Sequence, residues 1–255
     1  MTKYFLFEMT RPEIEEALAN GMKTAVCTFG STEQHGLHLP MGTDSIWGED
    51  LGHRIARGLG DALLLPGVRV GCSEHHMAFA GSLTLRKEIF IEVVRDICHS
   101  VARHGFEHLA LIPTHGGNFA PLAEAVAQIQ PELPALNLIT FSDLRVFMDA
   151  LVSVGAVHDL SPEVVGGHAG EHETSVILAL RPDLVQMEQA EEGFVGDFRS
   201  IAADIIAGGF EKVTPNGILG DPRPGTAVVG EEYMQAKTDL LVAYIRAQRK
   251  SNDDQ

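Results

Sequence analysis

The 255-residue chain contains few of the residues that mark disulfide-stabilised or membrane proteins. Its three cysteines, Cys27, Cys72 and Cys98, lack C-x-x-C spacing, so neither a disulfide framework nor a thiolate zinc site is expected. Glycine, proline or charge interrupts every apolar run before the roughly 20 residues that a membrane-spanning helix requires. We therefore expect no membrane partner.

Basic residues are also scarce, with 19 lysines and arginines against 35 aspartates and glutamates. They form no stripe that could follow a phosphate backbone, so a nucleic-acid partner is not expected. The first ten residues lack the basic start and the full hydrophobic stretch of a signal peptide. With so few cysteines, this pattern favours a cytoplasmic protein.

The remaining composition is that of a globular protein, with 45% apolar and 21% charged residues. A chain of this length can bury a substantial core, and we expect residues 1–255 to form a single domain. Its 12 histidines and 26 glycines are the unusual feature. Many of them fall near one another, in the loops that follow apolar segments.

Short apolar runs alternate with amphipathic stretches, which predicts repeated strand–loop–helix units. Strands are predicted at residues 23–29, 62–70 (interrupted by Pro66), 108–113 and 135–141. Helices are predicted at residues 45–59, 85–104, 121–130, 170–180 and 231–249. Residues 182–230 are weakly patterned, with one short helix expected near residues 200–206. Such units indicate a parallel sheet, whose ligands bind beyond the carboxyl ends of the strands.

The loop after the first strand, GSTEQHGLHLPMGTD, carries Glu33, His35 and Asp44. Side chains two apart in an extended chain point the same way, so Glu33 and His35 can face one ligand. Carboxylate and imidazole groups suit zinc, manganese or iron. The alternative is that Asp44 only caps the following helix, while the other two residues are solvated.

Two later loops carry similar groups. In THGGN, His115 follows a buried strand, and Gly116 and Gly117 would let the backbone approach a ligand; a tight turn is the alternative. In GGHAGEHETS, His168, Glu171 and Glu173 lie around a helix start. There the two carboxylates could instead only complement the helix dipole.

Four motifs in a fixed order resemble those of the creatininase family of creatinine amidohydrolase-like enzymes. They are GSTEQHGLHLPMGTD, SEHHMAFAGSLTL, THGGN and HAGEHETS. The resemblance covers roughly residues 22–180. It implies a three-layer α/β/α fold with a mostly parallel central sheet. It also implies a site for two divalent ions, usually zinc, manganese or iron, and frequently a homohexamer.

The resemblance assigns metal-ligand roles to matching positions. These are Glu33, His35 and His115, with Asp44 bridging the two ions. In creatininase itself an acidic residue stands two after the strand-end histidine, where this chain has Gly117, so Glu173 is expected to supply that carboxylate. This departure, together with the single tryptophan, Trp47, weighs against creatinine as the substrate.

The expected reaction is attack of metal-activated water on the carbonyl of a small, possibly cyclic amide. The resemblance makes His168 the catalytic histidine, with Glu171 as a group that could orient it. Substrate contacts are expected from the backbone of Gly116 and Gly117 and from two residues of the second loop, Glu74 and His75.

Two other functions remain compatible with the sequence. The same ions could serve cleavage of a carbon–carbon bond in a cyclic diketone of the inositol type. Alternatively, the ions could only stabilise a non-catalytic, oligomeric scaffold. The roles of His38, His76, His158 and His172 stay open.

Overall fold

The computed structural model describes residues 3–197 and 200–253, and its centre is a four-stranded parallel sheet. The strand order is β2-β1-β3-β4. The strands are β1 (Thr24–Phe29), β2 (Ala62–Leu64), β3 (His108–Pro113) and β4 (Asn137–Thr140). The predicted α/β class with a parallel sheet is therefore confirmed.

Strand β1 occupies the middle of the sheet, and all six of its residues are buried. It pairs with β2 from Thr24↔Ala62 onward and with β3 from Thr24↔His108 onward. Successive side chains enter opposite cores: Val26 packs in one, and Ala25 and Cys27 pack in the other. Burial on both faces explains why this strand reads as a continuous apolar run.

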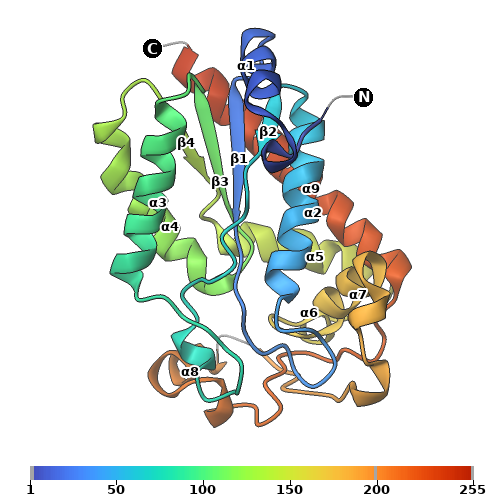
Figure 1. Ribbon diagram of the computed structural model, residues 1–255. Helices are drawn as coiled ribbons and strands as arrows, with labels where there is room; N and C mark the ends of the chain where they lie inside the picture. The colour runs from blue at the N-terminus through green and yellow to red at the C-terminus, as the bar shows by residue number, and fades with distance from the viewer. Residues whose placement is uncertain (1–2, 198–199, 254–255) are drawn as a thin grey trace.

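Helices cover both faces of the sheet, giving the expected three layers (Figure 1). One face is covered by α2 (Thr43–Leu59), α5 (Leu144–Val157), α7 (Glu171–Leu180) and α9 (Ala227–Asp253). The other face is covered by α1 (Arg11–Ala19), α3 (Lys87–Ala102) and α4 (Phe119–Ile129).

Two elements differ from the sequence prediction. Strand β2 ends at Leu64 rather than continuing to residue 70, because Pro66 cannot donate a backbone hydrogen bond to a neighbouring strand. Helix α1 was not predicted, although Thr10 and Glu13 form a capping box and a proline stands in its first turn. The expected short helix is present as α8 (Ala202–Gly208).

The loops that follow the strands gather below the sheet in Figure 1, where α6 (Pro162–Val165), α7 and α8 also lie. Between α7 and α9, much of the described chain consists of irregular segments and single turns such as Phe210–Lys212. Within the described residues, no helix has the length and apolarity needed to cross a bilayer.

Candidate metal centre

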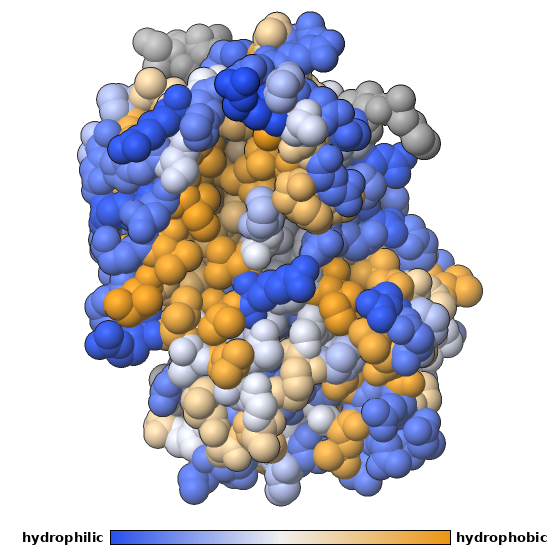
Figure 2. All heavy atoms as spheres, in the orientation of Figure 1, coloured by the Kyte–Doolittle hydropathy of each residue, from blue (hydrophilic) through white to orange (hydrophobic). Residues whose placement is uncertain are grey.

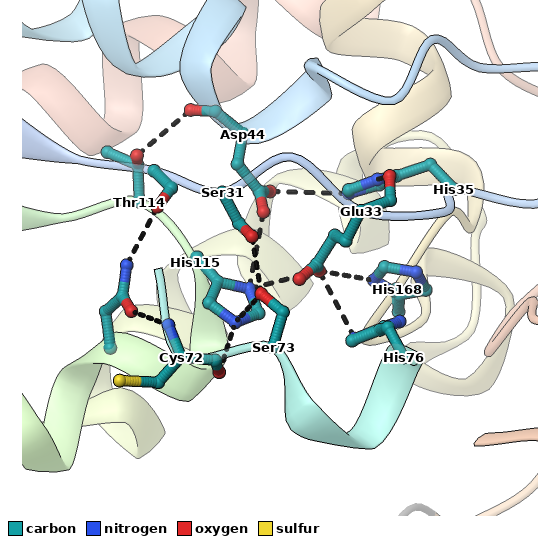
Figure 3. A network of polar contacts seen from close by, with 12 residues as sticks. Ser31, Glu33, His35, Asp44, Cys72, Ser73, His76, Thr114, His115 and His168 are labelled. Atoms are coloured by element: carbon teal, nitrogen blue, oxygen red, sulfur yellow. Dashed lines mark hydrogen bonds and ion pairs between the residues drawn. The ribbon is translucent and has the colours of Figure 1, made fainter. Parts of the chain in front are cut away.

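Five predicted ligands meet at the carboxyl edge of the sheet, and all of them are buried. Figure 3 shows four of them: Glu33, His35, Asp44 and His115. Glu33 and His35 lie on the loop after β1, and Asp44 lies in the first turn of α2. His115 follows β3, and Glu173 lies in the first turn of α7. Segments far apart in the sequence therefore converge on one cluster, as expected for a parallel sheet.

Asp44 lies between two histidines. Its Oδ1 is 3.3 Å from Nε2 of His35, and its Oδ2 is 3.3 Å from Nδ1 of His115. Asp44 is not the helix cap, because α2 has Gly42 at its N-cap position. The backbone oxygen of Asp44 accepts a hydrogen bond from Thr114 Oγ1 at 3.0 Å, which ties α2 to the end of β3.

The other carboxylates complete two groups that share Asp44. Glu33 Oε1 lies 3.1 Å from Nδ1 of His115, and Glu173 Oε2 lies 3.6 Å from Nε2 of His35. The far ring nitrogens are held by backbone carbonyls: His35 Nδ1 lies 3.1 Å from the oxygen of Glu33, and His115 Nε2 lies 3.1 Å from that of Cys72. Each ring therefore presents its other nitrogen to the carboxylates.

The chemistry of these groups fits divalent ions. In the part of the chain that is described, Oε2 of Glu33 is buried without a hydrogen-bond partner, and Oε1 of Glu33, Nε2 of His35 and Oδ2 of Asp44 are buried with only the ionic contacts of the cluster. Such atoms are costly in an apolar interior. Carboxylate oxygens and imidazole nitrogens are common ligands of zinc and manganese, so ions here would satisfy them.

The pKa values of two histidines show that the carboxylates make the cluster strongly negative. Burial acts to lower the pKa of His35, but Asp44 and Glu173 outweigh it and raise that pKa to about 10. For His115 burial is likewise outweighed, by Glu33 and Asp44, and its pKa lies well above the ordinary value. Without ions, protons on these two rings supply the compensating positive charge.

His168 approaches the same cluster. Its Nδ1 lies 3.8 Å from Glu33 Oε1, and its Nε2 donates a hydrogen bond to the backbone oxygen of Gln34 at 2.7 Å. Burial and the neighbouring His35 lower the pKa of His168 to about 3, so the ring is neutral near pH 7. A neutral imidazole can accept a proton during a reaction.

The expectation that Glu171 orients His168 is wrong. Its carboxylate accepts hydrogen bonds from Ser175 Oγ at 2.5 Å and from Tyr233 OH at 2.6 Å, within the packing of α7 against α9. Residues two apart on a helix do not share a face, so Glu171 and Glu173 cannot both point into the cluster. The backbone of Gln34 holds His168 instead.

In the second loop, a residue without an expected role reaches the cluster. Glu74 is exposed, whereas His76 is buried with its Nε2 3.2 Å from Glu33 Oε1. His75 is half-buried, and its ring lies nearly parallel to that of His115 at 5.7 Å. Of Glu74, His75 and His76, the one that reaches the carboxylates is the histidine without an assigned role.

Two further contacts were not visible in the sequence. The Phe210 ring stacks on His76, with centroids 4.2 Å apart, and therefore covers the cluster from the weakly patterned region. Lys237 is fully buried with its Nζ 3.9 Å from the centroid of Trp47. Burial lowers the pKa of Lys237 to about 7, although Glu173 and Asp44 partly oppose this.

Three other histidines whose roles the sequence leaves open lie apart from these ligand contacts. His38 hydrogen-bonds Thr174 at 2.8 Å, and His158 pairs with Glu232 at 2.7 Å. His172 packs edge-on against Tyr233. Their contacts agree with leaving them out of the ligand set.

A buried carboxylate–histidine cluster at the carboxyl edge of a parallel sheet is the arrangement that a metal-dependent hydrolase of the α/β class would need. A sequence model of the creatininase family, described as creatinine amidohydrolase, matches residues 7–245. The chain belongs to the creatininase family and is an amidohydrolase-type enzyme.

Curated relatives carry different names. A mycofactocin precursor peptide peptidase from Mycobacterium ulcerans is 30% identical over 225 residues, covering 85% of this chain and 82% of the relative. A creatinine amidohydrolase from Pseudomonas putida is 30% identical over 195 residues, covering 72% and 75%. A 3-dehydro-scyllo-inosose hydrolase from Thermotoga maritima is 25% identical over 264 residues, covering 96% and 83%.

Solved structures agree with the fold. A mutant creatininase described as Zn–Zn type superposes with a TM-score of 0.81 at 25% identity, covering 97% of this chain and 99% of that one. A manganese creatininase superposes with a TM-score of 0.80 at 25% identity and the same coverage.

Ion binding should strengthen as the pH rises. A histidine ligand must lose its proton, and His35 holds one up to about pH 10 in the empty cluster. Affinity should therefore increase by roughly tenfold per pH unit for each proton displaced. Titration calorimetry with zinc in buffers of different ionisation enthalpy should detect proton release near neutral pH. Equal affinity at low and high pH would contradict this.

The two glycines after His115 should respond differently to alanine. A Cβ at Gly117 would overlap Cys72 O and His115 Nε2, whereas a Cβ at Gly116 meets no atom within 4 Å. We expect Gly117→Ala to displace the His115 ring and to weaken zinc binding about 10–100-fold. Gly116→Ala is the matched control and should bind zinc normally. Equal zinc affinity in both variants would show that His115 does not depend on this close packing.

Proposed function

We propose that the chain binds two divalent ions and uses them to hydrolyse an amide bond in a small substrate. The observation that carries this proposal is the position of Asp44, whose two oxygens face His35 and His115 separately. One ion would be held by Glu33, Asp44 and His115, and the other by His35, Asp44 and Glu173.

Bound ions of this kind lower the pKa of water and polarise a substrate carbonyl. The protein's own groups would do the rest. His168, neutral and close to Glu33, would take a proton from the attacking water and pass it to the leaving nitrogen. The backbone N–H groups of Gly116 and Gly117, next to His115, would stabilise charge that develops on the carbonyl oxygen.

Creatinine itself is not the substrate that we propose. The single tryptophan, Trp47, is 3% exposed and packs in the core under Lys237, so it does not form a substrate wall. The relatives named as peptide peptidases support a peptide-like amide. We propose that half-buried His75 contacts this substrate, with Glu74 at the outer rim of the site.

Two other functions keep the same ligands. The relative named as an inosose hydrolase supports carbon–carbon cleavage of a cyclic diketone as the second candidate. A non-catalytic scaffold would bind the ions without turnover. Cleavage of an amide releases a new amino group, whereas cleavage of a diketone does not, so the products separate these reactions.

We also propose that the chain self-associates. The family resemblance implies that the assembly is a homohexamer. Large apolar side chains are exposed, including Phe7 at 55% and Leu83 at 51%. Figure 2 shows a broad apolar area crossed by hydrophilic residues on one face. Light scattering of the purified protein should give a mass several times the 27.6 kDa of one chain. A monomer at working concentration would refute this proposal.

Metal content and turnover together test the proposed reaction. We expect about two ions per chain by mass spectrometry. Asp44→Asn should lower the occupancy of both positions, and His35→Gln should lower mainly one. The control is His158→Gln, because His158 pairs with Glu232 away from the cluster. Each protein is then assayed with lactams, formamides, short peptides and inositol-derived diketones.

Release of a new amine by the unaltered chain, lost in Asp44→Asn, would support the amide hydrolase. Turnover of a diketone alone would replace it with the second candidate. Bound metal without turnover of any of these compounds would support the scaffold. Absence of bound metal, with no activity restored by added metal, would reject the metal-dependent reaction.

A further inference from the structure

Gln34 lies between two proposed ligands and is buried, with 4% of its surface exposed. Its side-chain amide contacts the backbone at Gly36 and Gly217 and the rings of His76 and His168. One side chain therefore joins the first loop, the second loop and the segment that carries Phe210.

The backbone contacts fix the orientation of this amide. The N–H of Gly36 can only donate and lies 2.8 Å from Oε1, whereas the carbonyl of Gly217 can only accept and lies 3.0 Å from Nε2. These two partners determine which atom of the Gln34 side-chain amide is the oxygen and which is the nitrogen. One amide hydrogen goes to Gly217, and the second remains for a histidine.

The second hydrogen does not go to His168. Nε2 of His168 lies 2.7 Å from the backbone oxygen of Gln34, which can only accept, so this nitrogen carries a proton. It cannot also accept from the amide of Gln34, although the two nitrogens are 3.0 Å apart. His168 therefore turns its other nitrogen, Nδ1, toward Glu33.

The hydrogen goes to His76, whose Nδ1 lies 3.1 Å from Gln34 Nε2. Since Nδ1 accepts, the proton of the neutral ring is on Nε2. That nitrogen lies 3.2 Å from Oε1 of Glu33. Nε2 of His76 therefore faces this carboxylate as a donor. It could ligate an ion only if its proton moved to Nδ1, where the amide of Gln34 already donates.

We propose that Gln34 is a positioning residue that holds His76 in its Nε2–H tautomer, so that His76 orients the carboxylate of Glu33. A contact chain then runs from Gly217 through Gln34 and His76 to a metal ligand. Groups that hold a metal ligand commonly control its affinity and geometry. The inference rests on the proposed role of Glu33, but the tautomers exist in the empty protein.

The test reads ring tautomers directly. In the chain labelled with 15N-histidine, long-range nitrogen–proton NMR should show His76 protonated at Nε2 and unprotonated at Nδ1 without added metal. The signals are assigned with single histidine substitutions. Gln34→Glu keeps an acceptor for Gly36 but replaces the donor facing His76, so Nδ1 of His76 should become protonated. His168 should keep its Nε2 proton, because a backbone oxygen holds it.

Gln34→Glu and Gln34→Met should both weaken zinc binding about 10–100-fold. Gln130→Glu is a matched control: Gln130 also joins backbone groups, at Leu133, Leu136 and Leu138, outside the cluster. The Gln130→Glu substitution should change neither the tautomers of His76 and His168 nor the affinity for zinc.

A protonated Nδ1 on His76 in the unaltered chain would overturn the inference, and so would unchanged zinc affinity in both Gln34 variants. If the unaltered chain binds no zinc, the proposed function fails, and the role assigned to Gln34 in orienting a metal ligand fails with it. The tautomers measured in the empty protein would still stand, which distinguishes the two failures.

Discussion

The carboxylates of Glu33, Asp44 and Glu173 are buried in one cluster, where water cannot screen their mutual repulsion. Positive charge offsets this repulsion, and the raised pKa values of His35 and His115 show that their rings carry it as bound protons. Divalent ions could replace these protons in balancing the carboxylates, and in the proposed site metal binding would then release protons.

The surrounding structure holds the cluster against that repulsion. The amide of Asn118 donates to the carbonyls of Phe29 and Gly30, at 2.9 and 3.0 Å, and its oxygen accepts from the N–H of Cys72. One side chain thereby fastens the ends of β1 and β3 to the second loop. Behind the cluster lies the buried Lys237, whose pKa burial lowers to about 7 while the nearby Glu173 and Asp44 act to raise it.

The sequence predicts the sheet from local patterns, and with the family resemblance it predicts which side chains meet at the sheet's edge. The run at residues 108–113 became β3, and its buried end placed His115 where a parallel sheet binds ligands. The direction of a side chain within a turn depends instead on tertiary packing. For that reason no sequence pattern indicates that Glu171 accepts a hydrogen bond from Tyr233 or that His76 reaches Glu33. Phe210 lies in a segment without periodicity, so no pattern indicated its contact with the cluster.

Phe210 and Gly217 reach the site from a stretch of chain that begins after the last proposed ligand, Glu173. The proposed metal ligands thus lie between residues 33 and 173, whereas Phe210 and Gly217, which cover part of the site, come from a later segment. In evolutionary terms, substitutions in this later segment can occur without any change to the proposed ligands. A lineage can therefore acquire a new substrate while inheriting its reaction chemistry unchanged.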